Sequence, residues 1–267
     1  MTPEASPQVW HYGLVARWWA EFNTDGPEID YFGGYIDRLG GPALDLACGA
    51  GRLLVPFLKA GLDVDGCDIS AEMLGHARRR ADAEGVSVNL YQQAAHELDL
   101  PRRYRTIIMC GGFALGGVRA HDQEALVRIQ RHLEPGGTLL FDCDAPYQSE
   151  RAWHLWTASG QRELPQPWPD EGDRKSTADG DEIELLGRVV SLDPLDQVIT
   201  RELHARLWRE GRLVAEEQHV LRERYYFRNE VIDMLTAAGF DSVTVREGYS
   251  DAAPTATTGI LVYEAVR

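Results

Sequence analysis

Long apolar runs are missing from this 267-residue sequence. No stretch approaches the roughly 20 consecutive apolar residues that a helix needs to cross a bilayer. Residues 1–7 contain neither the basic part nor the apolar part of a secretory leader. We therefore expect a cytoplasmic protein that does not use a membrane as a partner.

Positive charge is also scarce. The chain has 27 Lys and Arg against 42 Asp and Glu, which gives a formal net charge of −15. Its longest basic run is Arg78-Arg79-Arg80, on a predicted solvated helix face. Because such a chain repels a phosphate backbone at long range, nucleic acid is disfavoured as a partner and a small-molecule substrate is favoured.

Cysteine is the third scarce feature, with four residues at Cys48, Cys67, Cys110 and Cys143. They form no C-x-x-C pair and have no paired histidines nearby. This spacing indicates neither a metal site nor a disulfide framework. We expect reduced, buried thiols and no bound metal.

What is present is an alternation of short apolar segments with helical patterns. Strands are expected at residues 42–48, 64–67, 86–91, 106–110 and 138–143, and two more at 242–246 and 259–266. Helices separate most of them, and residues 134–137 form a turn before the fifth strand. Strands alternating with helices favour an α/β fold with a doubly wound, seven-stranded sheet.

Residues 146–227 interrupt this alternation. Residues 160–181 are rich in Gly, Pro, Asp and Glu and are predicted to form a long loop. Three strands at 183–192, 198–208 and 213–227 follow, joined by tight turns, so an inserted three-stranded antiparallel sheet is expected. The domain plan is then an N-terminal aromatic helical lid at 1–39, a core at 40–145 and 228–267, and an inserted substrate cap at 146–227. Whether the inserted sheet also pairs two subunits as a homodimer stays open.

A glycine turn follows the first strand at Gly49 and Gly51. Glycines let a ligand approach bare backbone, and the next helix presents unpaired N–H groups there. A dinucleotide fingerprint needs a third glycine where this chain has Leu54, so NAD is disfavoured. Asp68 ends the second strand, where a carboxylate can accept hydrogen bonds from ribose hydroxyls. The pattern favours a nucleoside without a pyrophosphate.

Segments 44–52, 68–74 and 133–137 together resemble the class I S-adenosylmethionine-dependent methyltransferases. The resemblance implies a Rossmann-like methyltransferase sheet and S-adenosylmethionine as cofactor. Within the family, an antiparallel sheet after the fifth strand is similar to sugar N-methyltransferases and glycine N-methyltransferase-like proteins. The implied activity is methyl transfer to an amine or hydroxyl of a small molecule. The alternative is a sensor or scaffold that binds the cofactor, or its demethylated product, without turnover.

The resemblance also implies which residues contact the cofactor. The glycine turn would pass beneath the methionine part, Asp68 would bind the ribose, and Ile69 with Met73 would pack on adenine. The family often has a carboxylate at the position of Ala94, so backbone there, or the side chain of Gln93 or Glu97, would take over. The aromatic segment Trp10, Tyr12, Trp18 and Trp19 resembles the family's lid. The implied set is Tyr12, Trp18, Ala47, Cys48, Gly49, Ala50, Gly51, Asp68, Ile69, Met73, Ala94, Ala95, His96, Cys110 and Gly111.

A catalytic base is not evident from the sequence. Methyl transfer is an in-line displacement that depends mainly on positioning and electrostatics. An amine substrate needs only to be deprotonated, whereas a hydroxyl usually benefits from a general base. The glycine-rich segment 110–117 offers no polar catalytic side chain. Candidates elsewhere are His11, Asp144, Tyr147 and Tyr225, and the sequence selects none of them.

Overall fold

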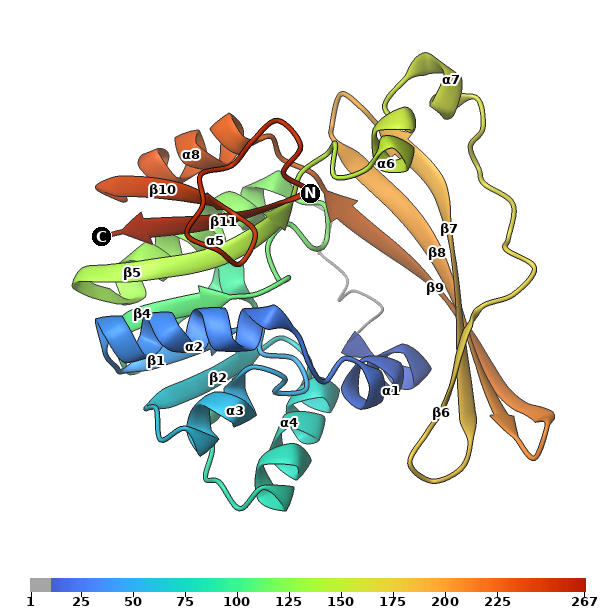
Figure 1. Ribbon diagram of the computed structural model, residues 1–267, viewed down its shortest axis with the longest axis horizontal. Coiled ribbons are helices and arrows are strands. Elements are labelled where there is room, and N and C mark those ends of the chain that lie inside the picture. The colour runs from blue at the N-terminus through green and yellow to red at the C-terminus, as the bar shows by residue number, and fades with distance from the viewer. Residues whose placement is uncertain (1–10) are drawn as a thin grey trace.

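The computed structural model describes residues 11–267, which form two sheets (Figure 1). Trp10 lies outside the described residues. The larger sheet contains β1 (Ala43–Leu46), β2 (Val64–Asp68), β3 (Leu90–Gln92), β4 (Tyr104–Met109), β5 (Leu133–Asp144), β10 (Ser242–Glu247) and β11 (Ile260–Val266). Its order is β10-β11-β5-β4-β1-β2-β3, and β11 runs antiparallel to both neighbours. The predicted seven-stranded, doubly wound sheet is confirmed.

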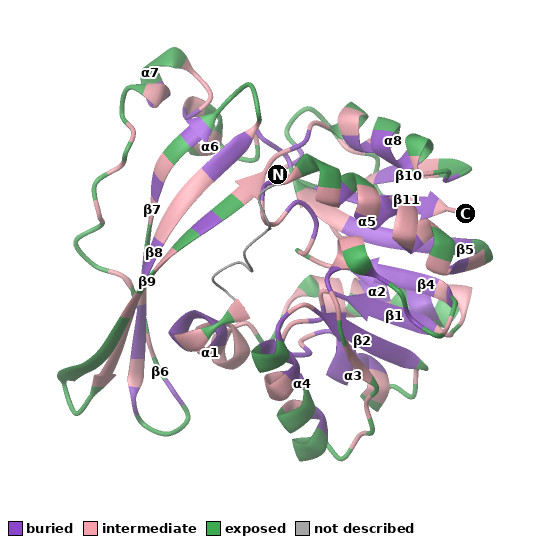
Figure 2. Cartoon of the chain, turned by 180° about the vertical axis from the view of Figure 1, so that it is seen from behind, coloured by how far each residue is buried: buried purple, intermediate pink, exposed green. Residues whose placement is uncertain are grey.

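Helices cover both faces of this sheet. Side chains alternate between the two faces, so Ile107 packs in one apolar cluster and Ile108 in the other. One face packs against α2 (Pro27–Leu39), α3 (Leu54–Lys59) and α4 (Ala71–Ala83). The other packs against α5 (Arg119–His132) and α8 (Arg228–Ala237). Figure 2 shows buried residues concentrated in the central strands, which therefore form a rigid base for the loops at their carboxyl ends.

The inserted sheet has four strands, so the prediction of three strands is wrong. Its order is β6 (Asp173–Ser176), β7 (Glu182–Asp193), β8 (Val198–Arg209) and β9 (Arg212–Arg224), all antiparallel. Strand β6 lies inside residues 160–181, which were predicted to be loop. Its four residues are all polar and pair only with β7, so no apolar alternation marked them. Two short helices, α6 (Glu150–His154) and α7 (Ala158–Gln161), precede it.

Other observed strand boundaries differ from the predicted ones by a few residues. The predicted turn at 134–137 lies within β5, where the register against β4 shifts between Tyr104 and Thr106. Strand β9 ends at Arg224, so Tyr225 follows the strand instead of belonging to it. Within residues 11–267, none of the helices combines the length and apolar character that crossing a membrane requires.

Helix α1 (Gly13–Phe22) lies between the two sheets (Figure 1). Leu14 and Val15 pack against the inserted sheet, whereas Ala16 packs against the glycine turn and Met73. Two carboxylates from opposite sides accept its first amides: Glu72 of α4 from Gly13 N at 3.1 Å, and Glu217 of β9 from Leu14 N at 2.9 Å. The helix therefore connects the core to the insert, directly beside the carboxyl ends of β1 and β2.

Candidate functional site

The glycine turn after β1 brings bare backbone to the edge of the sheet. Ala47, Gly49 and Gly51 have φ angles of 60°, 53° and 79°, in the left-handed region. A Cβ on Gly51 would lie 3.2 Å from the Cβ of Ala77, so this position also lets α4 pack closely. Ala47 adopts the same region with a side chain, which costs on the order of 1–2 kcal/mol. Such backbone strain is typical of functional sites.

Asp68, at the end of β2, is held by backbone amides. Its Oδ2 accepts from Gly49 N at 2.9 Å and its Oδ1 from Ser70 N at 2.8 Å, and the residue is only 4% exposed. Ser70 caps α4 through Met73 N, as its predicted N-cap role requires. Each carboxylate oxygen keeps a second lone pair. Asp68 can therefore accept further hydrogen bonds from a bound polyol.

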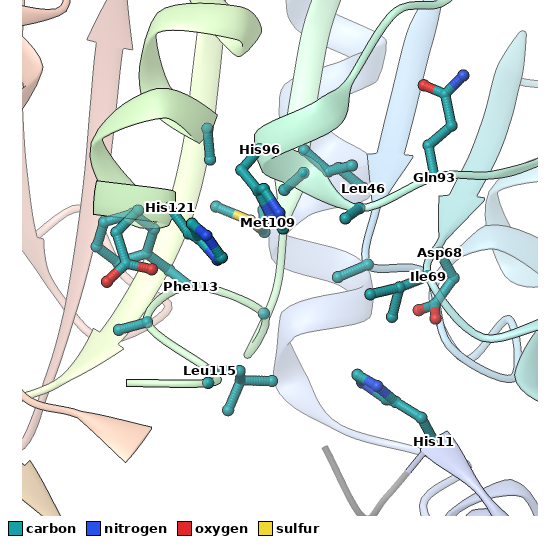
Figure 3. A pocket seen from close by; sticks show the side chains of 18 residues that line it. His11, Leu46, Asp68, Ile69, Gln93, His96, Met109, Phe113, Leu115 and His121 are labelled. Carbon is teal, nitrogen blue, oxygen red and sulfur yellow. The ribbon is translucent and has the colours of Figure 1, made fainter. Parts of the chain in front are cut away.

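Two cavities meet at Asp68. One has a volume of about 110 Å³ and the other of about 410 Å³, and His11, Ala47, Asp68, Gly112 and Leu115 line both. The smaller, shown in Figure 3, is also lined by predicted residues Ile69, Ala94, Ala95 and His96. The larger is also lined by Cys48, Gly49, Ala50, Met73, Cys110 and Gly111. One elongated ligand could therefore contact Asp68 at its centre and fill both cavities.

Three members of the predicted set do not line these cavities. Gly51 lies against Ala77, Tyr12 is 38% exposed, and Trp18 has the Lys175 ammonium 4.2 Å from its ring centroid. Trp19 lines the larger cavity instead. Because the two tryptophans are adjacent on one helix, sequence alone could not decide which of them faces inward.

The smaller cavity holds two titratable groups that sequence reasoning missed, His121 and Asp122, beside the predicted His96. The rings of His96 and His121 stack at 3.9 Å with an interplanar angle of 9°. Across from them in Figure 3 lie Asp68 and Ile69. Asp122, 6% exposed, accepts from the Tyr226 hydroxyl at 2.7 Å, and burial raises the pKa of its carboxyl to about 7. Burial also lowers the pKa of His96.

The two side chains expected to replace the missing carboxylate at Ala94 lie in different places, and Gln93 lines the smaller cavity. Gln93 hydrogen-bonds the backbone of Asp99 through both its oxygen and its nitrogen, at 2.8 and 3.2 Å. Glu97 lines neither cavity. The polar side chains at that end are His96, His121, Asp122 and the backbone-bonded Gln93, in addition to the backbone of Ala94 and Ala95.

A buried aspartate that lacks one hydrogen-bond partner lines the larger cavity. Asp45 is 3% exposed, and its Oδ2 has no hydrogen-bond partner within residues 11–267. Burial raises the pKa of this carboxyl to about 7, although Arg52 opposes the shift. Arg52 pairs with Glu28 of α2 and donates to Cys110 Sγ at 3.6 Å. An acid and an arginine that line one cavity are suited to an amino acid's ammonium and carboxylate.

A third cavity, of about 230 Å³, adjoins the larger one through Gly111, Leu115 and Glu223. We call it the acidic cavity, because three carboxylates line it, from Asp142, Asp144 and Glu223. Glu223 reaches this position because β9 is attached to the loop after β4. Leu115 and Glu223 form an antiparallel bridge, and Arg224 N donates to Ala114 O at 3.0 Å.

The proposed catalytic candidates lie in different places. His11 lines both cavities at Asp68, and burial lowers its pKa. Asp144 and Tyr225 line the acidic cavity, where burial raises the pKa of each. Tyr147 packs near Phe227 at 6.5 Å between ring centroids and lines none of these cavities. Glu223, absent from the candidates, is the carboxylate shared by the larger cavity and the acidic cavity.

Comparison with known proteins identifies a family model that matches part of the chain, and relatives that are similar to it. The family described as Methyltransferase domain matches residues 43–137. A Ubiquinone biosynthesis O-methyltransferase of Sodalis glossinidius is 28% identical over 232 residues, 82% of this chain and 83% of that protein. A dTDP-3-amino-3,4,6-trideoxy-alpha-D-glucopyranose N,N-dimethyltransferase of Streptomyces venezuelae is 31% identical over 102 residues, 37% of this chain and 40% of that protein.

A solved structure agrees over the whole chain. The sugar N-methyltransferase KedS8 from a Streptoalloteichus species superposes with a TM-score of 0.70 at 20% identity, covering 100% of this chain and 96% of that one. At this identity the likeness shows the shared fold, inserted sheet included. The predicted resemblance is confirmed for the fold: residues 43–137 match a methyltransferase domain, and the chain has the class I methyltransferase fold.

Proposed function

We propose that the protein methylates a small amine, whose nitrogen is held in the acidic cavity. The observation that carries this proposal is the position of Glu223, which lines both the acidic cavity and the larger cavity beside Asp68. The three carboxylates outnumber the one arginine of this cavity, Arg224, and therefore favour a protonated amine over an anion. The relative that dimethylates an amino sugar supports nitrogen, whereas the O-methyltransferase relative supports oxygen.

The two cavities at Asp68 fit S-adenosylmethionine, which supplies a sulfonium methyl group when bound. Asp68 would accept from the ribose, and His96 with His121 and Asp122 would surround adenine in the smaller cavity. Asp45 would receive the ammonium of the methionine part, which explains why its buried Oδ2 has no partner among the described residues. Arg52 would attract the carboxylate.

The chain's own residues then position the acceptor and remove a proton. Glu223 and Asp142 would orient the amine toward the larger cavity, and Asp142 is itself fixed by Gly111 N at 2.6 Å and the Tyr249 hydroxyl at 2.7 Å. Asp144, whose pKa burial and Asp142 raise, would accept the amine proton. Loss of that proton would free the nitrogen lone pair to take the methyl group that the cofactor supplies, and the methylated nitrogen would then carry the positive charge that the sulfonium gives up.

Turnover assays on matched substrates test this proposal. We would incubate the full chain with S-adenosylmethionine and pairs of amines and alcohols on the same scaffold, and detect methylated products by mass spectrometry. Methylation of the amines but not of their alcohols is expected. Methylation of alcohols alone would refute the nitrogen assignment, and cofactor binding without any product would favour the sensor alternative.

A further inference from the structure

A fourth cavity lies within the inserted part of the chain and has a volume of about 390 Å³. The inner face of β7 and β8 forms one wall, and the segment carrying α6 forms the other. Figure 1 shows α6 beside one end of these strands. Tyr225 lines both this cavity and the acidic cavity, so the two are neighbours.

The charged side chains that line the two neighbouring cavities differ: carboxylates outnumber the one arginine, Arg224, in the acidic cavity, whereas those of the fourth cavity are all arginines. Arg151, Arg188 and Arg201 line the fourth cavity, and no carboxylate is among the described residues that line it. We call it the arginine cavity. Arg188 and Arg201 each pair with a carboxylate that does not line this cavity, so Arg151 carries the uncompensated positive charge among the described residues that line it. A cavity of this kind favours an anionic ligand.

Each guanidinium retains hydrogen-bonding capacity. Arg201 donates to Glu223 Oε2 at 2.9 Å and to the Tyr225 hydroxyl at 3.3 Å, and it thereby joins the two cavities. Arg188 pairs with Glu202 at 2.6 Å. Arg151 is exposed and forms no ion pair within residues 11–267. Because a guanidinium has five donors in a planar fork, all three can still bind carboxylate or phosphate oxygens.

The rest of the wall is apolar and aromatic. Leu155, Val189, Leu192 and Ile199 are buried together, and Trp156 packs against them. The Trp156 ring lies edge-on to Tyr225, with 6.3 Å between ring centroids. A flat ring attached to an anionic group could therefore pack here while its charge meets the arginines.

We propose that the arginine cavity binds an anionic group, carboxylate or phosphate, carried on a planar or apolar part of the methyl acceptor. The acceptor then extends across Tyr225, with its amine in the acidic cavity and its anion in the arginine cavity. This inference rests on the proposed amine methylation, and it adds the acceptor's second recognition element. Neutral and purely cationic amines would accordingly be poor acceptors.

Calorimetry on the full chain, saturated with the demethylated cofactor S-adenosylhomocysteine, tests the proposal. The probes are phenyl phosphate, benzoate and the neutral benzyl alcohol. We expect at least one anion to bind more tightly than benzyl alcohol, and its affinity to fall about tenfold in the Arg151→Gln/Arg188→Gln double variant, as expected for lost charged hydrogen bonds. Binding of phenyl phosphate alone identifies a phosphate site, and binding of benzoate as well identifies a general anion site.

A control variant and a second ligand keep the outcomes separate. Arg162→Gln changes an exposed arginine of the same segment that does not line the cavity, and should bind the anions like the unaltered chain. The anion site would be overturned if the anions and benzyl alcohol bound with equal affinity. It would also be overturned if the double variant bound the anions as tightly as the unaltered chain does. Benzylamine binding that depends on Glu223 would still stand in that case, so failure here is distinguishable from failure of the proposed function.

Discussion

The core and the insert build their binding surfaces by different means. In the core, backbone shapes the site: Asp68 is held by the amides of Gly49 and Ser70, and Gly112 passes directly beside Ala47. In the insert, long side chains shape it, because Arg201 and Glu223 project from extended strands. The shape of the core surface therefore depends on backbone contacts, whereas that of the insert depends on side chains that single substitutions can change.

From this contrast we infer that the core binds the cofactor and the insert recognises the acceptor. Substitutions at the core surface should damage cofactor binding or stability, whereas substitutions in the insert should change acceptor recognition and leave cofactor affinity alone. The predictions below would sharpen or break this distinction, beginning with the largest expected effect.

Gly112→Ala should produce the largest loss. A Cβ at this position would lie 2.6 Å from the Cβ of Ala47, which has little freedom to move because its backbone is left-handed. We expect destabilisation by about 1–3 kcal/mol from overpacking, and loss of calorimetrically measurable S-adenosylmethionine binding. Gly34→Ala is the control, because it lies within α2 with nothing within 4 Å of its Cβ. Unchanged binding by Gly112→Ala would show that the close approach of Gly112 to Ala47 is not required for binding S-adenosylmethionine.

Asp68→Ala should weaken binding of S-adenosylmethionine by about 1–3 kcal/mol, because charged hydrogen bonds to the ribose are lost. Titration calorimetry measures the change. The variant also leaves Gly49 N and Ser70 N without their acceptor, so thermal unfolding must be recorded in parallel. An affinity equal to that of the unaltered chain would rule out the ribose role.

Glu223→Gln should reduce kcat/KM for an amine acceptor about tenfold, since the charged partner of the ammonium is lost. The dissociation constant of S-adenosylhomocysteine should stay within about twofold of the unaltered value. Glu216→Gln is the matched control on the same strand, because that side chain is 55% exposed and lines none of the three binding cavities. A large loss of cofactor affinity in Glu223→Gln would break the division between core and insert.

Asp122→Asn should change how the stability of the free protein depends on pH. Between the ordinary aspartate pKa and about 7, the folded protein holds a proton on Asp122 that the unfolded chain releases. The free energy of unfolding therefore falls as pH rises through this window, by up to about 1.4 kcal/mol per pH unit.

Asparagine resembles the protonated acid and does not ionise. The contribution of residue 122 to the pH dependence of the free energy of unfolding should therefore disappear. The variant should match the unaltered chain near pH 4 and exceed its stability at pH 8. Denaturant unfolding at both values measures the difference. Asp233→Asn, at an exposed position of α8, should leave the slope unchanged, and an unchanged slope in Asp122→Asn would show that this carboxyl is ionised in the folded state.

Much of the core could be predicted from sequence because its signals are local. The alternation of apolar strands with helices predicted the seven-stranded sheet, and two cavities lie beside the glycine turn and Asp68, where a cofactor was expected. Strand β6 was missed because its polar residues are strand only by pairing with β7. Asp45 was within the quoted motif but was not selected, since burial and the lack of a partner are not visible in sequence.

The sequence by itself determined the fold class and the position of the glycine turn, because each depends on residues close together in the chain. Only the tertiary structure decided that Trp19 rather than Trp18 lines a cavity, that His121 and Asp122 join His96, and that Glu223 meets the loop after β4. It also placed an acidic cavity beside an arginine cavity. These groups are far apart in sequence and gather only when the insert packs over the sheet's carboxyl edge, so no local pattern could reveal them.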